Sequence, residues 1–192
     1  MTDHVLHLLA QYLPLTAAEA DAVVAHGLIQ HMPAGTVLLR EGAVARACYL
    51  VLQGCVRSYF LLEGQEKTAA FYTEGQPLLT VSYTTQQPAA HYLVCAEDCW
   101  LLSGSPAGNQ ALFERYPRLE TLGRLISSAL LAETQTTLDS YRNLSPQQRY
   151  LQLLQTRPEL VRRVPQYHLA SYLGIQPESL SRIRRRLQRE QA

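Results

Sequence analysis

One stretch near the C-terminus, residues 165–187, restricts the fold more than any other part of the chain. It reads PQYHLASYLGIQPESLSRIRRRL and divides into two helical segments at Gly174, a residue type that often ends helices in the left-handed conformation. Pro177 then suits the first position of a second helix. Apolar residues recur at helical spacing in both segments, so each helix should have one buried face. The residues that we expect on these faces are Leu169, Ala170, Leu173, Leu180, Ile183 and Leu187.

The second helix of this pair carries charge on the side away from its apolar stripe. At 3.6 residues per turn, Glu178, Arg182, Arg185 and Arg189 lie on that side. A basic helix joined to a shorter helix by a glycine turn is typical of a helix-turn-helix with its recognition helix.

Charge is distributed unevenly along the chain of 192 residues. The net charge is only +1, but residues 143–192 hold nine arginines against three glutamates, which leaves +6 there and −5 in the remainder. This difference indicates two regions with different partners, of which the basic one suits a polyanion. The N-terminus lacks a basic flank and a long apolar run, so we expect a cytoplasmic protein with no signal peptide and no membrane span.

Between Gly35 and Ser103 the pattern changes to short β-rich runs separated by turn residues. Several short strands at this spacing predict an antiparallel sandwich, barrel or roll, and Gly54 between two of the runs predicts a tight hairpin. The runs are TVLLR, CYLVLQ, CVRSYFLL, KTAAFYT, PLLTV, HYLVCA and CWLLS.

Helices are predicted on both sides of the β-rich region. The first spans residues 3–13, and a capping box formed by Thr16 and Glu19 begins the next. After a short helix that stops at Pro117, a long one runs to about Asn143. Its length exceeds what a small roll can cover, which favours pairing with a second copy over packing on the roll alone. The expected dimer seam consists of Leu119, Leu122, Ile126, Ala129 and Leu130.

The four cysteines lie in the middle of the chain without a CxxC pair. An iron–sulfur or redox site is one interpretation, and reduced core cysteines are the favoured one. We find no clear nucleophile–base pair, no metal-ligand spacing and no glycine-rich phosphate loop. We therefore expect no catalytic residue, no metal and no cofactor, and an enzyme is the least favoured class.

The order of N-terminal helices, β-roll, long helix and helix-turn-helix resembles the cAMP receptor protein/FNR superfamily of bacterial transcription regulators. The residues that carry the resemblance in the roll are Gly35, Glu41-Gly42 and residues 49–56, and those in the C-terminal part are residues 169–175 and 178–183. The resemblance covers nearly the whole chain, and the C-terminal motif is its more specific part. It implies an α+β fold, with residues 1–116 as a cyclic-nucleotide-binding-like sensor domain, 117–143 as a dimerisation helix and 144–192 as a DNA-binding domain.

The resemblance places Glu178, Ser179 and Arg182 at the base edges of the major groove. Arg182 can donate two hydrogen bonds to a guanine, and Glu178 can accept one from a cytosine. The alternative is a solvated Glu–Arg pair one helical turn apart. Arg185, Arg186 and Arg189 are expected at phosphates, which add affinity without sequence information.

Three departures from the family pattern modify this expectation. Pro177 replaces an arginine that often precedes the glutamate, so one base contact is missing. The chain ends five residues after Leu187, so we expect no β-wing after the recognition helix. The segments that match the cyclic-nucleotide phosphate site, residues 74–78 and 87–91, contain no arginine, so we expect no tight cAMP binding.

The sequence therefore predicts a homodimeric regulator that reads a pseudo-palindromic site in double-stranded DNA. Further partners to consider are RNA polymerase and an unidentified small-molecule effector. The alternative hypothesis is a ligand-sensing or protein-interaction module whose helix-turn-helix does not bind DNA.

Overall fold

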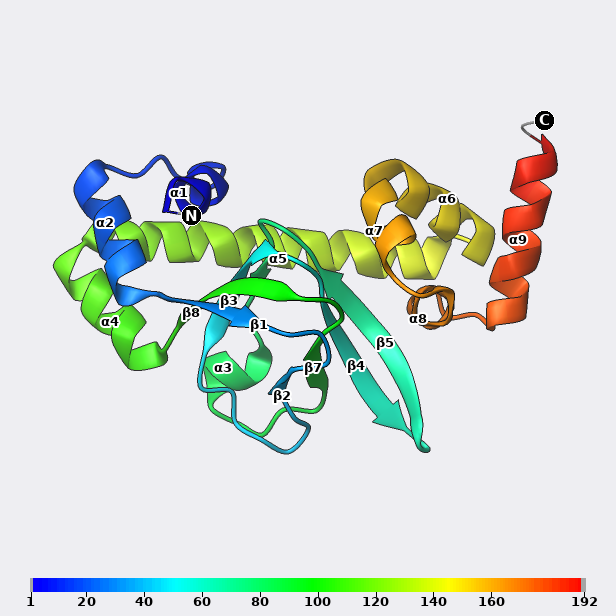
Figure 1. Ribbon diagram of the computed structural model, residues 1–192, viewed down its shortest axis with the longest axis horizontal. Coiled ribbons are helices and arrows are strands. Elements are labelled where there is room, and N and C mark those ends of the chain that lie inside the picture. The colour runs from blue at the N-terminus through cyan, green and yellow to red at the C-terminus, as the bar shows by residue number, and fades with distance from the viewer. Residues whose placement is uncertain (1, 191–192) are drawn as a thin grey trace. The chain divides into compact units, whose positions relative to one another are not determined.

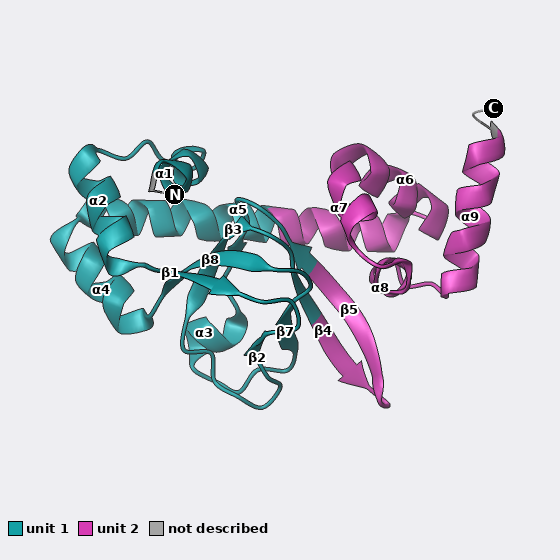
Figure 2. Ribbon diagram, in the orientation of Figure 1, with its two compact units in different colours: residues 1–58, 71–132 teal, residues 59–70, 133–192 magenta. Residues whose placement is uncertain are grey.

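The computed structural model describes residues 2–190 and divides the chain into two compact units (Figure 2). The first unit comprises residues 1–58 and 71–132, and the second comprises residues 59–70 and 133–192. This division places the tip of one β-hairpin with the C-terminal helices, an association that the sequence pattern did not indicate.

The β-rich region forms two four-stranded sheets (Figure 1). Their strand orders are β1-β8-β3-β6 and β2-β7-β4-β5, and the predicted α+β class with an antiparallel roll is confirmed. Apolar side chains on the inner faces, among them Val51, Val56, Leu93 and Leu101, are at most 2% exposed. The strands are β1 (Leu28–Met32), β2 (Val37–Leu39), β3 (Cys48–Gln53), β4 (Val56–Leu62), β5 (Gln65–Tyr72), β6 (Pro77–Leu78), β7 (Tyr92–Cys95) and β8 (Cys99–Gly104).

Two details of the strand prediction were wrong. The run PLLTV is not one strand, because β6 ends at Leu78 and helix α3 (Val81–Thr85) follows. The Thr80 hydroxyl accepts a hydrogen bond from the Tyr83 N–H and begins that helix. The sequence pattern also missed β1, which pairs antiparallel with β8 from Leu28 opposite Ser103 to Met32 opposite Cys99.

The hairpin predicted at Gly54 was also wrong. The strands on either side of it, β3 and β4, belong to different sheets, so Gly54 lies at a corner between the sheets. Its φ is +102°, and a Cβ there would lie 2.5 Å from the Asp98 carbonyl oxygen and 2.7 Å from Cys99 Sγ. Only glycine fits this backbone conformation and this close approach without strain.

The hairpin in this part of the chain joins β4 to β5 instead. Its turn residues, Glu63 and Gly64, have φ values of +53° and +76°. Positive φ at both central residues is the conformation of a type I′ turn, whose twist matches that of the flanking strands.

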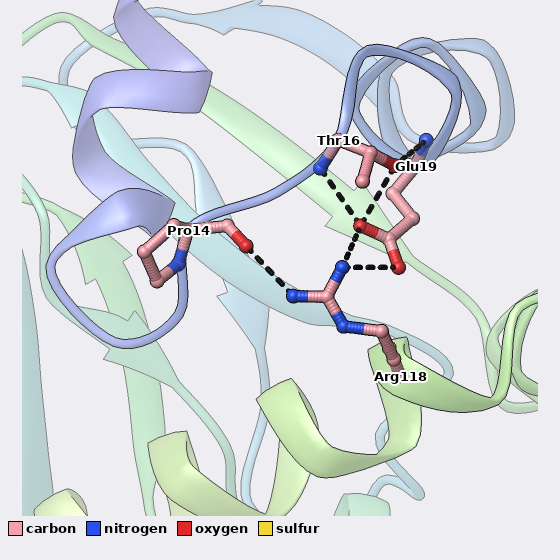
Figure 3. Close-up of polar contacts among 4 residues, drawn as sticks. All are labelled: Pro14, Thr16, Glu19 and Arg118. Carbon is pink, nitrogen blue, oxygen red and sulfur yellow. Dashed lines mark hydrogen bonds and ion pairs between the residues drawn. The ribbon is translucent and has the colours of Figure 1, made fainter.

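The N-terminal helices of the first unit are α1 (Thr2–Ala10) and α2 (Ala17–His26). The predicted capping box is confirmed, since the Thr16 hydroxyl accepts from the Glu19 N–H and the Glu19 carboxylate accepts from the Thr16 N–H. Arg118 also donates to both Glu19 carboxylate oxygens, at 3.0 and 3.2 Å, and to the Pro14 carbonyl oxygen at 3.1 Å (Figure 3). The pKa of Glu19 is lowered, first by the hydrogen bond from the Thr16 backbone and also by the Arg118 charge.

The long helix, α5 (Pro117–Asn143), follows α4 (Pro106–Arg115), as predicted. Leu119 and Leu122 pack in the core of the first unit and are 1% and 5% exposed, so their side chains are already covered within one chain. Of the other residues in the predicted seam, Ile126 packs partly against the same core, Leu130 is half-buried and Ala129 is exposed.

The cysteines form no disulfide within residues 2–190. Cys55, Cys95 and Cys99 are buried and Cys48 is half-buried, which agrees with the interpretation of reduced core cysteines. A hydrogen bond to Cys99, and then burial, raise the pKa of Cys95.

Four helices follow in the second unit. Ser145 forms a capping box with Gln148 at the start of the first of them. Tyr150 and Leu153 are buried on its inner face, and Leu151 and Leu154 are half-buried. The helices are α6 (Pro146–Thr156), α7 (Pro158–Arg163), α8 (Gln166–Tyr172) and α9 (Pro177–Glu190).

Candidate nucleic-acid interface

The turn between α8 and α9 has the predicted form. Gly174 has a φ of +70°. The Gly174 N–H donates to the Ser171 carbonyl, and the Ile175 N–H donates to the Ala170 carbonyl, a hydrogen-bond pattern that ends helices through a left-handed residue. The Gln176 carbonyl then accepts from the Ser179 and Leu180 N–H groups, so α9 begins immediately after the turn.

The apolar faces of α8 and α9 meet under this turn. Leu169, Ala170 and Leu180 are 0% exposed and Leu173 is 2% exposed. Ile183 is half-buried, as is Leu187. The predicted apolar stripe of α9 is therefore buried most completely near the start of the helix, at Leu180, and less completely towards its end.

The opposite face of α9 is exposed along its length. Glu178 and Arg182 are exposed, and Ser179 beside them is half-buried. Within the described part of the chain, neither Glu178 nor Arg182 forms an ion pair with another residue. The exposed arginines nearer the end of the helix are Arg185, Arg186 and Arg189, while Arg184 is half-buried.

Arg149 on α6 is a functional candidate that sequence reasoning missed. Its guanidinium donates to the carbonyl oxygens of Leu144 and Leu173 at 2.9 Å and of Tyr141 at 3.3 Å, and it lies over the Tyr141 ring. Carbonyl groups at helix C-termini lack partners within their own helix and attract cations. Arg149 therefore ties the end of α5 to the end of α8, directly before the turn that leads into α9.

The helix-turn-helix also contacts a β-strand within the second unit. The Ser171 hydroxyl on α8 accepts from the Thr68 N–H at 2.9 Å and donates to the Glu66 carbonyl at 3.4 Å. Strand β5 is at the edge of its sheet, so this hydroxyl occupies backbone groups that would otherwise face solvent. No sequence signal marks this contact, because its partners lie about a hundred residues apart.

The region of the roll that matches the cyclic-nucleotide phosphate site has structural contacts of its own. The Glu74 carboxylate accepts from the Gly54 N–H at 2.9 Å, and Gly75 has a φ of +79°. His91 is half-buried, and burial lowers its pKa. The single lysine, Lys67, donates to Gln65 on the β4–β5 hairpin, in the second unit.

Metal-ligand clusters and membrane-spanning helices are both absent from residues 2–190. No group of three or more His, Cys, Asp or Glu side chains in this part of the chain could hold a metal ion. No helix combines the length and hydropathy that crossing a membrane requires.

Comparisons with known proteins agree with this geometry. The cyclic nucleotide-binding domain family matches residues 29–116, while no curated protein sequence matches the chain. Among solved structures, Thermus thermophilus catabolite activator protein is 25% identical, with a TM-score of 0.58 over 93% of this chain and 86% of that one. The regulator CLP of Xanthomonas campestris is 21% identical, with a TM-score of 0.69 over 91% and 93% of the two chains. FixK2 of Bradyrhizobium japonicum is 18% identical, with a TM-score of 0.70 over 85% of each chain.

These matches include both the roll and the C-terminal helices, and they confirm the resemblance seen in the sequence. Residues 29–116 therefore form a domain of the cyclic nucleotide-binding family, and the chain as a whole has the fold of the cAMP receptor protein/FNR superfamily.

Proposed function

We propose that this chain is a homodimeric transcription regulator that reads a pseudo-palindromic site in double-stranded DNA through α9. The observation that carries the proposal is the exposed face of α9, where Glu178 and Arg182 have no ion-pair partner among the described residues. A helix of this kind presents side chains to base edges while its buried stripe fixes its orientation. The family and the fold support a regulatory role rather than an enzymatic one.

The roles proposed for the individual residues follow from their positions on α9. Glu178, Ser179 and Arg182 lie at its start and contact bases, whereas Arg185, Arg186 and Arg189 lie further along and contact phosphates. Functionally, residues 1–116 act as the sensor, residues 117–143 as the dimerisation helix and residues 144–192 as the DNA-binding domain.

Dimerisation is proposed to use the exposed part of α5. Leu131 is 60% exposed and Leu138 is 47% exposed, and the two lie seven residues apart on one helix. That spacing is the repeat of a coiled-coil seam, so we propose a seam through these two leucines. Of the residues predicted from the sequence, Leu130 lies nearest this face, whereas Ile126 and Ala129 lie roughly 120–180° around the helix from it. Two copies joined in this way would hold their helix-turn-helix units one DNA turn, roughly 34 Å, apart.

The seam is tested by sedimentation of two variants with the same added charge. Leu138→Glu should shift the purified chain towards monomer, because it places two like charges in the apolar seam. Thr136→Glu changes a position on the opposite side of α5, one heptad after Ala129, and should leave a dimer joined through Leu131 and Leu138 intact. Equal behaviour of the two variants would contradict this seam.

DNA recognition is tested first by selecting bound duplexes from a random library with the purified chain and no added ligand. A two-fold symmetric site is expected. On that site Arg182→Ala should lose discrimination at one base pair, by about 1–3 kcal/mol. Arg189→Ala should weaken binding to all sequences and lower the salt slope by about one.

An equal effect of the two arginine variants would contradict the assignment of base and phosphate contacts. A folded dimer that binds no duplex at any salt concentration would favour the alternative function, a module whose helix-turn-helix contacts an acidic protein. We also propose that cAMP does not control the chain, because residues 74–78 and 87–91 offer no arginine to a cyclic phosphate. A cytoplasmic location, contact with RNA polymerase and an effector of another class remain parts of this proposal.

A further inference from the structure

A cavity of about 730 Å³ lies in the first unit, between one side of the β1-β8-β3-β6 sheet and helices α2, α4 and α5. This volume is within the range of small-molecule sites in proteins. The wall is mainly apolar, with Leu50 and Leu102 from the sheet, Leu112 from α4 and Leu122 from α5. Of the two segments that match the family's cyclic-nucleotide phosphate site, residues 87–91 do not line the cavity, and residues 74–78 contribute only Pro77 and Leu78.

One cluster of polar groups lies in this apolar wall, and its three members come from different elements. The Asn109 amide nitrogen on α4 donates to the Tyr83 hydroxyl at 3.0 Å and to Cys48 Sγ at 3.4 Å. The Cys48 thiol donates to the Gly104 carbonyl at 3.4 Å. Gly104 makes the arrangement possible, because a Cβ there would lie 2.6 Å from Asn109 Oδ1.

The cluster retains hydrogen-bonding capacity for a ligand. Among residues 2–190, no donor is hydrogen-bonded to Asn109 Oδ1. The Tyr83 oxygen accepts from Asn109, and its own O–H is hydrogen-bonded to Cys48, whose sulfur is a weak acceptor that a ligand oxygen can replace. Burial, together with Cys48, raises the pKa of Tyr83 to about 12, so the hydroxyl keeps its proton at neutral pH. One acceptor and one donor side by side are complementary to a hydroxyl group, which can donate to the first and accept from the second.

Charge around the cavity does not favour an ionised ligand. Glu120 and Arg124 line it one helical turn apart on α5, both are exposed, and their charges are opposite. The polar cluster itself is neutral. A carboxylate would meet Asn109 Oδ1 as a second acceptor and would have to leave water without a buried cation to receive it.

We propose that this cavity binds a neutral, largely apolar molecule that carries one hydroxyl group, with the hydroxyl between Asn109 and Tyr83 and the apolar body along the leucine wall. The proposal concerns binding alone and stands whether or not the chain binds DNA. A medium-chain alcohol has the required chemistry and serves as a probe.

The test is calorimetric titration of the full chain with decan-1-ol and with decanoate, at two temperatures. Decan-1-ol should bind saturably with a negative heat-capacity change, the mark of apolar burial. Decanoate should bind at least about tenfold more weakly, the cost expected for one lost or mismatched hydrogen bond. Asn109→Leu has a similar shape without the polar groups and should weaken decan-1-ol binding by about the same factor.

A matched pair of α5 variants locates the binding. Gly123 lines the cavity, and a Cβ there meets only the Phe113 ring, at 3.4 Å, so Gly123→Leu should fold and fill part of the cavity. Ser128 is exposed on the same helix outside the cavity, so Ser128→Leu should bind decan-1-ol like the unchanged chain. The proposal is overturned if decan-1-ol shows no saturable binding, which is the result expected if a second copy of the chain covers the cavity. It is also overturned if Gly123→Leu leaves the affinity unchanged, or if decanoate binds more tightly.

Discussion

The two compact units are stabilised in different ways. The first has a continuous apolar interior, in which Val51, Val56, Cys99 and Leu101 are fully buried. Its backbone is also closely packed, as where Gly54 approaches Asp98 and Cys99. The second has a smaller core around Leu169 and hydrogen bonds that join elements through Arg149 and Ser171. Apolar packing resists any change of arrangement, whereas a few polar bonds can be exchanged for others. The comparison suggests a rigid first unit and a second unit whose arrangement is easier to alter.

This difference can be measured because only one unit contains a tryptophan. Trp100 lies on β8 in the first unit, so its fluorescence reports unfolding there. Far-ultraviolet circular dichroism follows the helices of both units, so unfolding of the second unit appears in circular dichroism but not in tryptophan fluorescence. Denaturant unfolding followed by both signals therefore distinguishes the stabilities of the two units.

The largest effect is expected at the corner of the roll. Gly54→Ala places a Cβ 2.5 Å from the Asp98 carbonyl oxygen at a φ of +102°, so steric overlap and backbone strain add. Each of these costs about 1–3 kcal/mol, and we expect a loss of about 3–5 kcal/mol in the tryptophan-detected transition. Gly35→Ala is the control, because Gly35 also lies in the first unit and has positive φ but no atom within 4 Å of the new Cβ. It should cost only about 1 kcal/mol, and equal losses would show that close packing at the corner does not limit the first unit.

Gly54 also illustrates how far the sequence could predict this fold. Local patterns correctly predicted the capping box at Thr16, the end of α8 at Gly174 and the bounds of α5, because each depends on neighbouring residues. A glycine between two strands indicates a change of direction but not whether the strands share a sheet, so the corner was mistaken for a hairpin.

The candidate site was predictable to a similar extent. The exposed face of α9 follows from helical periodicity, which needs only residues within a few turns of one another. The hydrogen bond from Arg149 to Leu173 joins residues that are 24 positions apart in the sequence, and the one between Thr68 and Ser171 joins residues that are 103 positions apart. In the polar cluster of the cavity, Cys48 and Asn109 are separated by 61 positions. No local pattern encodes such pairs, so the fold had to be known first.

A smaller loss is expected from the core of the second unit. Leu169 is 0% exposed, and Leu169→Ala should cost about 3 kcal/mol through lost burial and the cavity left behind. The change should appear in circular dichroism, with the tryptophan signal unchanged if the units unfold separately. Tyr167→Ala, at a position 59% exposed on the same helix, should change stability by no more than about 0.5 kcal/mol. A loss below 1 kcal/mol for Leu169→Ala would mean that polar bonds, and not this core, dominate the second unit.

The bonds of Arg149 should contribute somewhat less than that core. Arg149→Met keeps much of the aliphatic stem but removes three hydrogen bonds to helix-end carbonyls, and we expect a loss of about 2 kcal/mol. Arg142→Met is the control, since Arg142 is exposed near the end of α5 and forms no ion pair among the described residues. Equal losses of stability in the two variants would contradict the view that polar bonds such as those of Arg149 stabilise the second unit. If the loss is confirmed, Arg149→Met should also weaken DNA binding without changing the preferred sequence, because the base-contacting side chains remain.

The smallest effect concerns a polar contact in the apolar first unit. The pKa of Glu19 is held below its ordinary value of 4.5 by the Thr16 backbone hydrogen bond and by Arg118. A carboxyl with a lowered pKa in the folded chain stabilises it above about pH 4.5, and this contribution disappears as the pH falls through the folded value. Thr16→Ala removes the cap and should cost about 1 kcal/mol at pH 7. Glu19→Gln should lower stability at pH 7, and its difference from the unchanged chain should shrink as the pH falls through the lowered pKa of Glu19 and the carboxyl becomes protonated. Denaturant unfolding at pH 7 and at a series of lower pH values measures this, and a difference that stayed constant with pH would show that the carboxylate charge adds nothing beyond the cap.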